Sequence, residues 1–329
     1  MPKELAHFTV ALRTARLLGD SPFGLAAKHH DASLLLGSVF HDAWFYLTGA
    51  KPGRLGELAD ELHGAHGEDT FWLLERQAET AREARLAGEE HAQRAGTAAS
   101  LLVGMASHLC ADVALHPLVY HHSGNYYSDK KAVERHRRLE TLLDMALDAT
   151  GEAVNVNPRI ASMLRAVRLA GAFPRDALAE RAKISPEALA SELKDALQVF
   201  ALVQRHTQSS SQARLAWMLR PLLPQGARDF AALFYAPQLK RHLPLVRGPI
   251  SWRHPVTGEE RTATLDQLLG EAAESAAGLL RRMEPFVFGE APAPGLSASG
   301  MMGPSLDTGL PGVGPDQATH FAPAPLPPR

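Results

Sequence analysis

The chain has 329 residues, of which 45% are hydrophobic and 21% are charged, and its single cysteine excludes an intramolecular disulfide bond. The 34 Lys and Arg residues against 36 Asp and Glu give a net charge of −2, so no global basic field would attract nucleic acid. Twelve of the 16 histidines lie in the first 140 residues, and because histidine is the commonest protein metal ligand, we place the chemistry there.

The first residues are predicted to be helical. Residues 3–18 repeat apolar or small side chains at helical spacing, with His7 in the first turns. Residues 31–48 form a second, strongly apolar helix, and Asp42 lies late in it among apolar neighbours. Burying a carboxylate in such surroundings costs free energy unless its charge is compensated. Asp42 is therefore a candidate functional residue.

A glycine-broken turn then carries two more histidines, His63 and His66. Loop histidines at the start of a helix are well placed as ligands, because the scaffold fixes the backbone while the turn lets the side chains point inward. One of the two is sufficient for a site. The long, charged helix predicted over 69–95 is typical of a solvent-facing element.

The most informative stretch is the apolar run 97–120, which contains His108, Asp112 and His116. Residues four apart lie on one face of an α-helix, so the two imidazoles and the carboxylate would stack along a buried stripe. Pro117 is predicted to end this helix. No 18-residue apolar window is free of charge, so we expect no transmembrane segment.

A second helix carries His136 and Glu140, again four residues apart. Two helices with a short connection and nitrogen and oxygen ligands on facing stripes are typical of metal sites in helical bundles. The alternative is a hydrogen-bonded polar network without metal. The cost of burying Asp112 beside two imidazoles favours a metal ion.

The rest of the chain is predicted to extend the all-α bundle, with a strand-and-turn signal around residues 256–259. We expect a helical domain over 1–288, with the metal site in 1–145 and a helical extension in 146–288. Residues 289–329 are rich in Pro and Gly and are expected to be a disordered tail outside the core. The further helices are predicted over 138–149, 158–171, 186–207, 211–221, 226–235 and 263–283.

The order of these residues resembles the zinc-dependent phospholipase C family, and the segments MPKELAH and HGAHGEDT are similar to its bacterial intracellular branch. The resemblance implies two or three Zn²⁺ ions, with Asp112 bridging two of them and Asp42 also orienting or deprotonating the attacking water. His121 and His122 are alternatives to His116. The implied ligands are His7, Asp42, His63 or His66, His108, Asp112, His116, His136 and Glu140.

These features predict a cytoplasmic metal-dependent phosphodiester hydrolase that cleaves a phospholipid or a related phosphodiester. Clustered divalent ions suit this reaction because they activate water and neutralise the phosphate. We expect no nucleic-acid partner and, at most, transient contact with a membrane surface. Two alternatives are an HD-type phosphohydrolase, whose metal would centre on His41, and a non-catalytic helical module with a structural metal or none.

Overall fold

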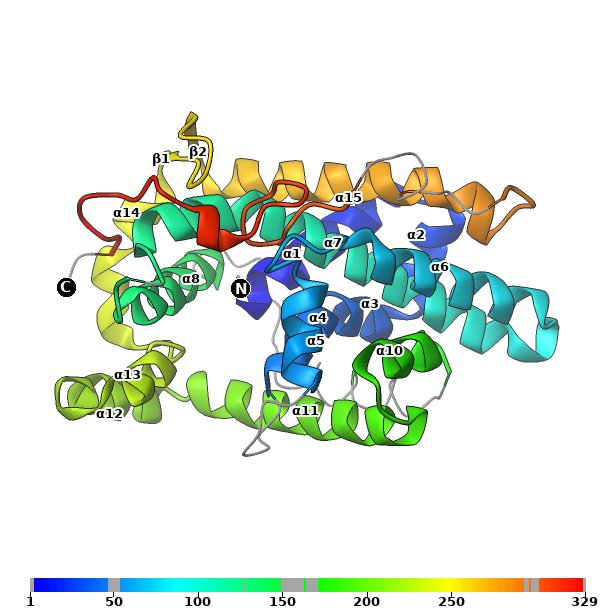
Figure 1. The fold of residues 1–329 in the computed structure, drawn as a ribbon, viewed down its shortest axis with the longest axis horizontal. Coiled ribbons are helices and arrows are strands. Elements are labelled where there is room, and N and C mark those ends of the chain that lie inside the picture. The colour runs from blue at the N-terminus through cyan, green and yellow to red at the C-terminus, as the bar shows by residue number, and fades with distance from the viewer. Residues whose placement is uncertain are drawn as a thin grey trace.

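The structure, a computed structural model, describes residues 3–46, 54–126, 128–148, 163, 171–292, 296 and 302–327. Within these residues the fold is an all-α bundle with one small hairpin, which confirms the predicted fold class (Figure 1). One continuous hydrophobic core runs through it, from Leu5 near the N-terminus to Leu306 near the C-terminus.

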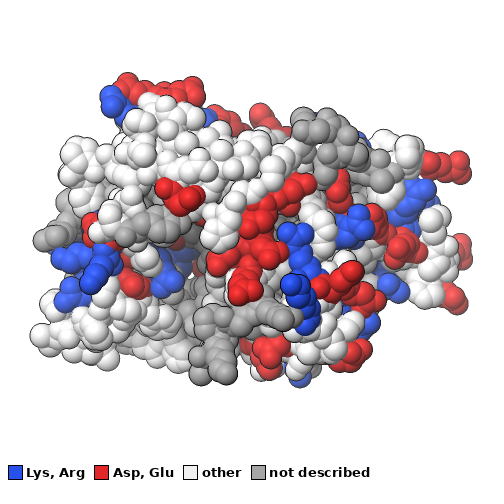
Figure 2. Space-filling model, viewed as in Figure 1, with Lys and Arg blue, Asp and Glu red and all other residues white. Residues whose placement is uncertain are grey.

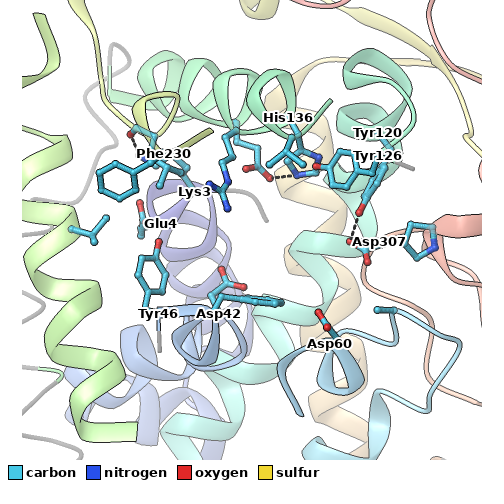
Figure 3. A pocket seen from close by; sticks show the side chains of 18 of the residues that line it. Lys3, Glu4, Asp42, Tyr46, Asp60, Tyr120, Tyr126, His136, Phe230 and Asp307 are labelled. Atoms are coloured by element: carbon cyan, nitrogen blue, oxygen red, sulfur yellow. Dashed lines mark hydrogen bonds and ion pairs between the residues drawn. The ribbon is translucent and has the colours of Figure 1, made fainter. Parts of the chain in front are cut away.

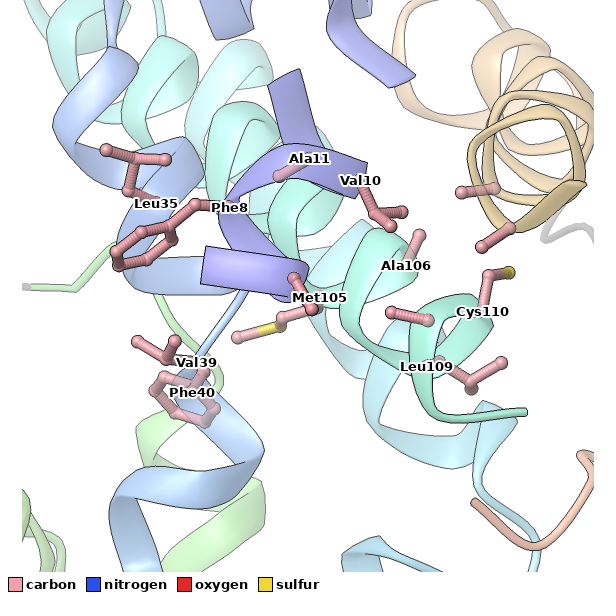
Figure 4. Close-up of a cluster of buried hydrophobic side chains, with 14 of the residues drawn as sticks. Phe8, Val10, Ala11, Leu35, Val39, Phe40, Met105, Ala106, Leu109 and Cys110 are labelled. Atoms are coloured by element: carbon pink, nitrogen blue, oxygen red, sulfur yellow. The ribbon is translucent and has the colours of Figure 1, made fainter. Parts of the chain in front are cut away.

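The central element is α7 (Ala92–Ser123), which lies in the middle of the bundle and packs against helices from both ends of the chain (Figure 1). Its neighbours are α1 (Glu4–Leu18), α2 (Pro22–His29), α3 (Asp31–Gly37), α6 (Phe71–Leu86), α8 (Ala132–Asp148) and α15 (Leu265–Val287). Figure 4 shows part of the apolar packing between α7, α1 and α3, including Phe8, Leu35 and Met105. By length and composition alone α7 could cross a membrane, but 89% of its apolar window is buried inside the protein.

The prediction that Pro117 ends the central helix is wrong, since α7 continues to Ser123. Proline removes one helical hydrogen bond and costs about 3 kcal/mol in a helix interior. Leu115, Leu118 and Val119 are fully buried around it, and each buried side chain of this kind contributes about 1.5–3 kcal/mol. Burial on both sides of the proline therefore outweighs the lost bond.

Two other predicted helices are divided in the structure. The segment 31–48 forms α3, the short α4 (Phe40–Ala43) and the 3-10 turn η1 (Trp44–Tyr46), while residues 47–53 lie outside the described residues. The segment 69–95 breaks at Gly88, whose φ of 106° suits glycine, so that η2 (Glu89–His91) and the start of α7 come after α6. The break after α3 places Asp42 on a separate turn that faces α7.

The remaining elements build the lower and left parts of Figure 1. The helix predicted over 158–171 falls almost wholly outside the described residues, whereas the hairpin predicted around 256–259 is present as an antiparallel pair. The elements are α5 (Arg54–Leu62), α10 (Arg175–Ala182), α11 (Pro186–Thr207), α12 (Ser210–Leu219), η3 (Arg220–Leu222), α13 (Gln225–Ala231), η4 (Pro237–His242), α14 (Pro244–Arg247), β1 (Ile250–Arg253), β2 (Glu260–Ala263) and η5 (Pro315–Gln317).

Residues 302–327, which we name the C-terminal strap, differ from the expected disordered tail because they lie against the helices. The strap is held largely by backbone hydrogen bonds: Leu306 N–H donates to the His63 carbonyl over 2.8 Å, and Ala322 N–H donates to the His121 carbonyl over 2.7 Å. Ser305 and Leu306 are fully buried. Figure 1 shows the strap running beside α7 towards α14.

Two glycines allow α3 and α7 to approach closely. A Cβ at Gly104 would lie 2.2 Å from the Leu34 carbonyl oxygen, and one at Gly37 would lie 2.3 Å from the Leu101 carbonyl oxygen. No such separation is possible for real atoms, so only glycine permits this crossing. The crossing places α4 and its Asp42 against the histidine-bearing part of α7.

Gly104→Ala is therefore expected to destabilise the protein by about 1–3 kcal/mol, because the added methyl must push α3 away from α7. Thermal unfolding monitored by circular dichroism measures the effect. Gly278→Ala is the matched control, since its Cβ would meet nothing within 4 Å on α15, and it should stabilise by about 0.4–1 kcal/mol. Equal melting temperatures for the two variants would contradict the close approach.

Candidate metal centre

Seven buried side chains from four segments of the chain meet in two adjoining groups beside α7. Within each group the possible ligand atoms all lie within 4.8 Å of one another. The first group is Asp42, His63, His108 and Asp112, and the second is His116, His136 and Glu140. These groups bring together seven of the nine residues predicted as ligands.

Asp112 belongs to the first group and also faces the second. Its Oδ2 is 3.1 Å from Nε2 of His108 in the first group, and its Oδ1 is 3.9 Å from Nε2 of His116 in the second. The i, i+4, i+8 spacing on α7 produces this arrangement, as the sequence pattern predicts. The second group is closed by Glu140, whose Oε1 lies 2.8 Å from His136 Nε2 and 3.6 Å from His116 Nε2.

Three of the histidines are oriented in the same way by main-chain carbonyls. The Nδ1–H of His63 donates to the Ala59 carbonyl over 2.7 Å. In the same way, His108 donates to the Ser38 carbonyl over 2.9 Å and His116 to the Leu306 carbonyl over 2.8 Å. A carbonyl oxygen only accepts, so in each neutral ring the proton is on Nδ1 and Nε2 carries a lone pair. Each Nε2 is thereby aimed at the carboxylates, which is the usual arrangement of zinc-binding histidines.

The buried carboxylates of the two groups require positive charge nearby to balance them. Burial alone would lower the pKa of His108, but the charges of Asp112 and Asp42 raise it to about 9. Burial likewise opposes ionisation of Asp112, yet His108 and His116 hold its pKa well below the ordinary range. The carboxylates therefore remain ionised inside the core, where protons on the facing imidazoles balance their charge until a cation takes the place of those protons.

The residues present fit a metal. The buried atoms His108 Nε2, His116 Nε2 and both carboxylate oxygens of Asp112 have no hydrogen-bond partner among the described residues. Buried polar atoms are almost always satisfied, so several orphans pointing at one another mark a place for a missing ligand. Imidazole nitrogen and carboxylate oxygen at this density suit Zn²⁺.

His7 on α1 is the eighth candidate and lies at the junction of the groups. Its Nε2 is 3.5 Å from Asp112 Oδ1 and 3.6 Å from Asp42 Oδ2, and its ring stacks on His108 with centroids 4.2 Å apart. Burial and the neighbouring His108 lower the pKa of His7 to about 4, so the ring is neutral and can donate a lone pair to a cation. Asp144 of α8 fixes the start of α1 by accepting from the N–H of Leu5 and Ala6.

A family model described as zinc dependent phospholipase C matches residues 6–203 of this chain. The chain belongs to this family. The match includes His7 and both groups of candidate ligands. A search of curated proteins and a search of solved structures found no match. Membership of the zinc-dependent phospholipase C family and the buried His/Asp cluster agree on a zinc-binding, phospholipase-like protein.

His41, on which an HD-type phosphohydrolase would centre its metal, lies outside both groups. Its ring is fully buried and stacks on His108 with centroids 4.5 Å apart and planes 4° from parallel. The ring supports His108 from the side opposite His7. Asp42 instead joins His63, His108 and Asp112, an arrangement that matches the zinc-dependent phospholipase C resemblance and not an HD pair.

Other polar residues near the groups face elsewhere. Cys110 is buried, its pKa is raised by burial to about 12, and its side chain points towards α15 (Figure 4). His121 and His122, the alternatives to His116, lie against the strap and the hairpin, next to the carbonyls of His320 and Ser251.

His63 and His66 can now be distinguished, since His63 belongs to the first group while His66 lies at the cavity rim outside it. His63→Ala is expected to lower the rate of phosphodiester hydrolysis by at least about 10²-fold, because Asp42 loses its nearest imidazole. His66→Ala should stay within a few-fold of the original protein. Parallel kcat measurements test this, and an inactive His66 variant beside an active His63 variant would reverse the assignment.

A cavity of about 640 Å³ opens onto both groups through Asp42, His136 and Glu140 (Figure 3). The opposite wall is apolar, with Val199 and Val203 of α11 and Leu233 after α13. Further polar lining comes from Lys3, Glu4, Tyr46, Asp60, Tyr120, Tyr126, Arg137 and Asp307. The centre is therefore open to a ligand with a polar end and an apolar end.

The strap contributes to the centre, which the sequence reasoning missed. Besides the Leu306 carbonyl on His116, Asp307 accepts from the Tyr120 hydroxyl over 3.0 Å and lines the cavity. These residues lie beyond the matched family region, which ends at residue 203. No sequence signal could have found them, because the decisive group, Leu306 C=O, is main chain.

Proposed function

We propose that the protein is a zinc-dependent phosphodiester hydrolase of the phospholipase C type, acting on a phospholipid or a closely related phosphodiester. The observation that carries the proposal is the set of three imidazoles anchored through Nδ1, whose Nε2 atoms converge on buried carboxylates at the floor of an open cavity. A purely structural metal would be closed off by its ligands, whereas both groups here reach the cavity.

Bound zinc would supply water of lowered pKa and would neutralise the phosphodiester charge. His63, His108, Asp112 and Asp42 would hold ions in the first group, and the second group would hold another. Asp42 also lines the cavity, so its carboxylate is placed to orient the attacking water and accept its proton.

The cavity walls supply substrate binding. Arg137 is half-buried in the lining and forms no salt bridge with another described residue, so its guanidinium can pair with the non-bridging phosphate oxygens. Val199, Val203 and Leu233 offer an apolar surface to the hydrocarbon part of a lipid. Together these walls match a molecule that joins a phosphodiester to an acyl glycerol.

Hydrolysis of bis-p-nitrophenyl phosphate and of a short-chain phosphatidylcholine tests the proposal. Both activities should disappear on chelation and return with Zn²⁺ but not with Mg²⁺, since the nitrogen-rich ligand set disfavours magnesium. Product analysis should find phosphocholine and diacylglycerol. A protein that binds zinc at full occupancy but cleaves neither substrate would instead be a non-catalytic metal-binding module.

A further inference from the structure

The helix α12 turns an apolar stripe towards solvent. Leu215, Met218 and Leu222 are 56%, 70% and 83% exposed, and Leu219 lies between them at 42%. Leu215, Met218 and Leu219 follow i, i+3 and i+4 spacing on α12, and Leu222 ends the 3-10 turn η3 that comes directly after it. We name these four residues the α12 face. In a globular protein a stripe with this spacing is normally turned inward, but Ala213 alone is buried on α12.

Single exposed leucines are ordinary, but four large exposed apolar side chains within eight residues are not. A contiguous exposed apolar patch marks a surface that binds another molecule or a membrane. Phe230 on α13, a helix that packs against α12, is also exposed. The α12 face is therefore a candidate docking surface.

The segment that carries the α12 face has almost only positive charges of its own, although Glu134 of α8 pairs with Arg220 over 2.9 Å. Residues 205–247 contain seven Lys and Arg side chains and a single acid, Asp229, in a chain whose net charge is −2. Five of the seven are exposed, namely Arg205 on α11, Arg214 on α12, Lys240 and Arg241 on η4, and Arg247 on α14. Figure 2 shows this end, at the lower left, as uncharged surface with Lys and Arg side chains beside it, while acidic side chains gather over the middle of the same face.

The same end of the protein adjoins the cavity. The helix α12 packs against α11, α13 and η4, and the two helices beside it supply the cavity's apolar wall through Val199 and Val203 of α11 and Phe230 of α13. The α12 face thus lies on a helix next to the two that supply the apolar side of the cavity.

We propose that the α12 face docks on the surface of an anionic phospholipid bilayer, with Leu215, Met218 and Leu222 entering the boundary between headgroups and acyl chains and with the arginines against lipid phosphates. This inference rests on the proposed function, because docking brings the cavity's apolar wall to its lipid substrate. A second copy of the chain fits the surface poorly, since a two-fold contact through this face would bring the two cationic surroundings together.

Co-sedimentation with vesicles of phosphatidylcholine and phosphatidylglycerol in equal parts tests the proposal. The protein should bind these vesicles, and the triple variant Leu215→Ser, Met218→Ser, Leu222→Ser should bind at least about tenfold more weakly. The single variant Leu222→Ser, at the most exposed position, should show a smaller loss in the same direction. Leu86→Ser, at a 62% exposed leucine on α6, is the matched control and should bind normally. Raising the salt concentration should weaken binding.

Turnover of soluble bis-p-nitrophenyl phosphate separates this proposal from the proposed function. The triple variant should retain that turnover, because the α12 face does not line the cavity. Vesicle binding that is absent in the original protein, or unchanged in both variants, overturns the docking proposal whatever the turnover. A dimer in analytical ultracentrifugation that the triple variant abolishes, without vesicle binding, would assign the face to a second copy. Absence of turnover in the zinc-loaded original protein would refute the proposed hydrolase function but would leave the docking proposal standing.

Discussion

Asp112→Asn is expected to lower the zinc content of the protein and to reduce phosphodiester hydrolysis by at least about 10²–10³-fold. The substitution keeps the size of the side chain but removes the one carboxylate that faces both groups. Asp112 has His7, His63, His108 and His116 within 4.0 Å of its oxygens. An amide cannot offset the charge of a divalent ion, and its NH₂ would repel any metal that the neighbouring imidazoles retain.

Equilibrium dialysis followed by elemental analysis measures zinc per chain, and bis-p-nitrophenyl phosphate measures turnover. A chelator should lower the melting temperature of the original protein, since binding to the native state alone stabilises it, and should have little effect on the variant. Asp60→Asn is the matched control, because Asp60 lines the cavity but belongs to neither group. Full zinc occupancy in the Asp112 variant would show that this carboxylate is not a ligand.

The helical periodicity around Asp112 was sufficient to predict which residues share a face, because i, i+4 geometry is local and independent of the rest of the fold. His108, Asp112 and His116 are stacked along α7, and His136 and Glu140 along α8, as their spacing indicates. The place of Asp42 in the site could not be predicted in this way, because it depends on the helix break between α3 and α4, which no local sequence pattern indicates. The structure brings it to His63 and His108 only because Gly37 and Gly104 let α3 and α7 touch.

The turn that carries His63 and His66 shows where local reasoning stops. Both histidines precede a glycine, and Gly64 and Gly67 both have positive φ, at 64° and 89°. The two positions are therefore equivalent to any rule based on sequence. They differ in their three-dimensional surroundings: His63 directly follows α5 and contacts Asp42, whereas the N–H of His66 donates to Glu68 at the rim of the cavity.

Composition misled most about the strap, because Pro and Gly content predicts the absence of regular structure and not the absence of packing. The strap has little secondary structure, yet its main-chain carbonyls accept hydrogen bonds from side chains of the helical part of the protein. Thr70 Oγ1 donates to the Pro304 carbonyl and Arg138 donates to the Pro327 carbonyl, over 2.8 and 2.7 Å. Such pairings depend on backbone atoms, which are alike in every residue and leave no trace in composition.

Removing residues 302–329 is accordingly expected to lower the melting temperature by more than about 10 °C and to abolish hydrolysis. The deletion would uncover the surface beneath Leu306, and it would leave His116 Nδ1–H and the His63 carbonyl without their partners. Each unsatisfied buried group costs about 1–3 kcal/mol, and total stability is only about 5–15 kcal/mol. Calorimetry of the truncated and full chains measures the difference, and equal melting temperatures would mean that the strap does not pack.

Because the truncated chain could be insoluble, Leu306→Ala provides a milder version of the same experiment. Loss of this fully buried side chain should cost about 2–5 kcal/mol, and loosening the carbonyl that orients His116 should weaken zinc binding by about 10–100-fold. Gln317→Ala, at an exposed position of η5 in the same strap, is the matched control and should change neither quantity. A Leu306 variant that loses stability but keeps its zinc affinity would show that the strap packs on the centre without orienting its ligands.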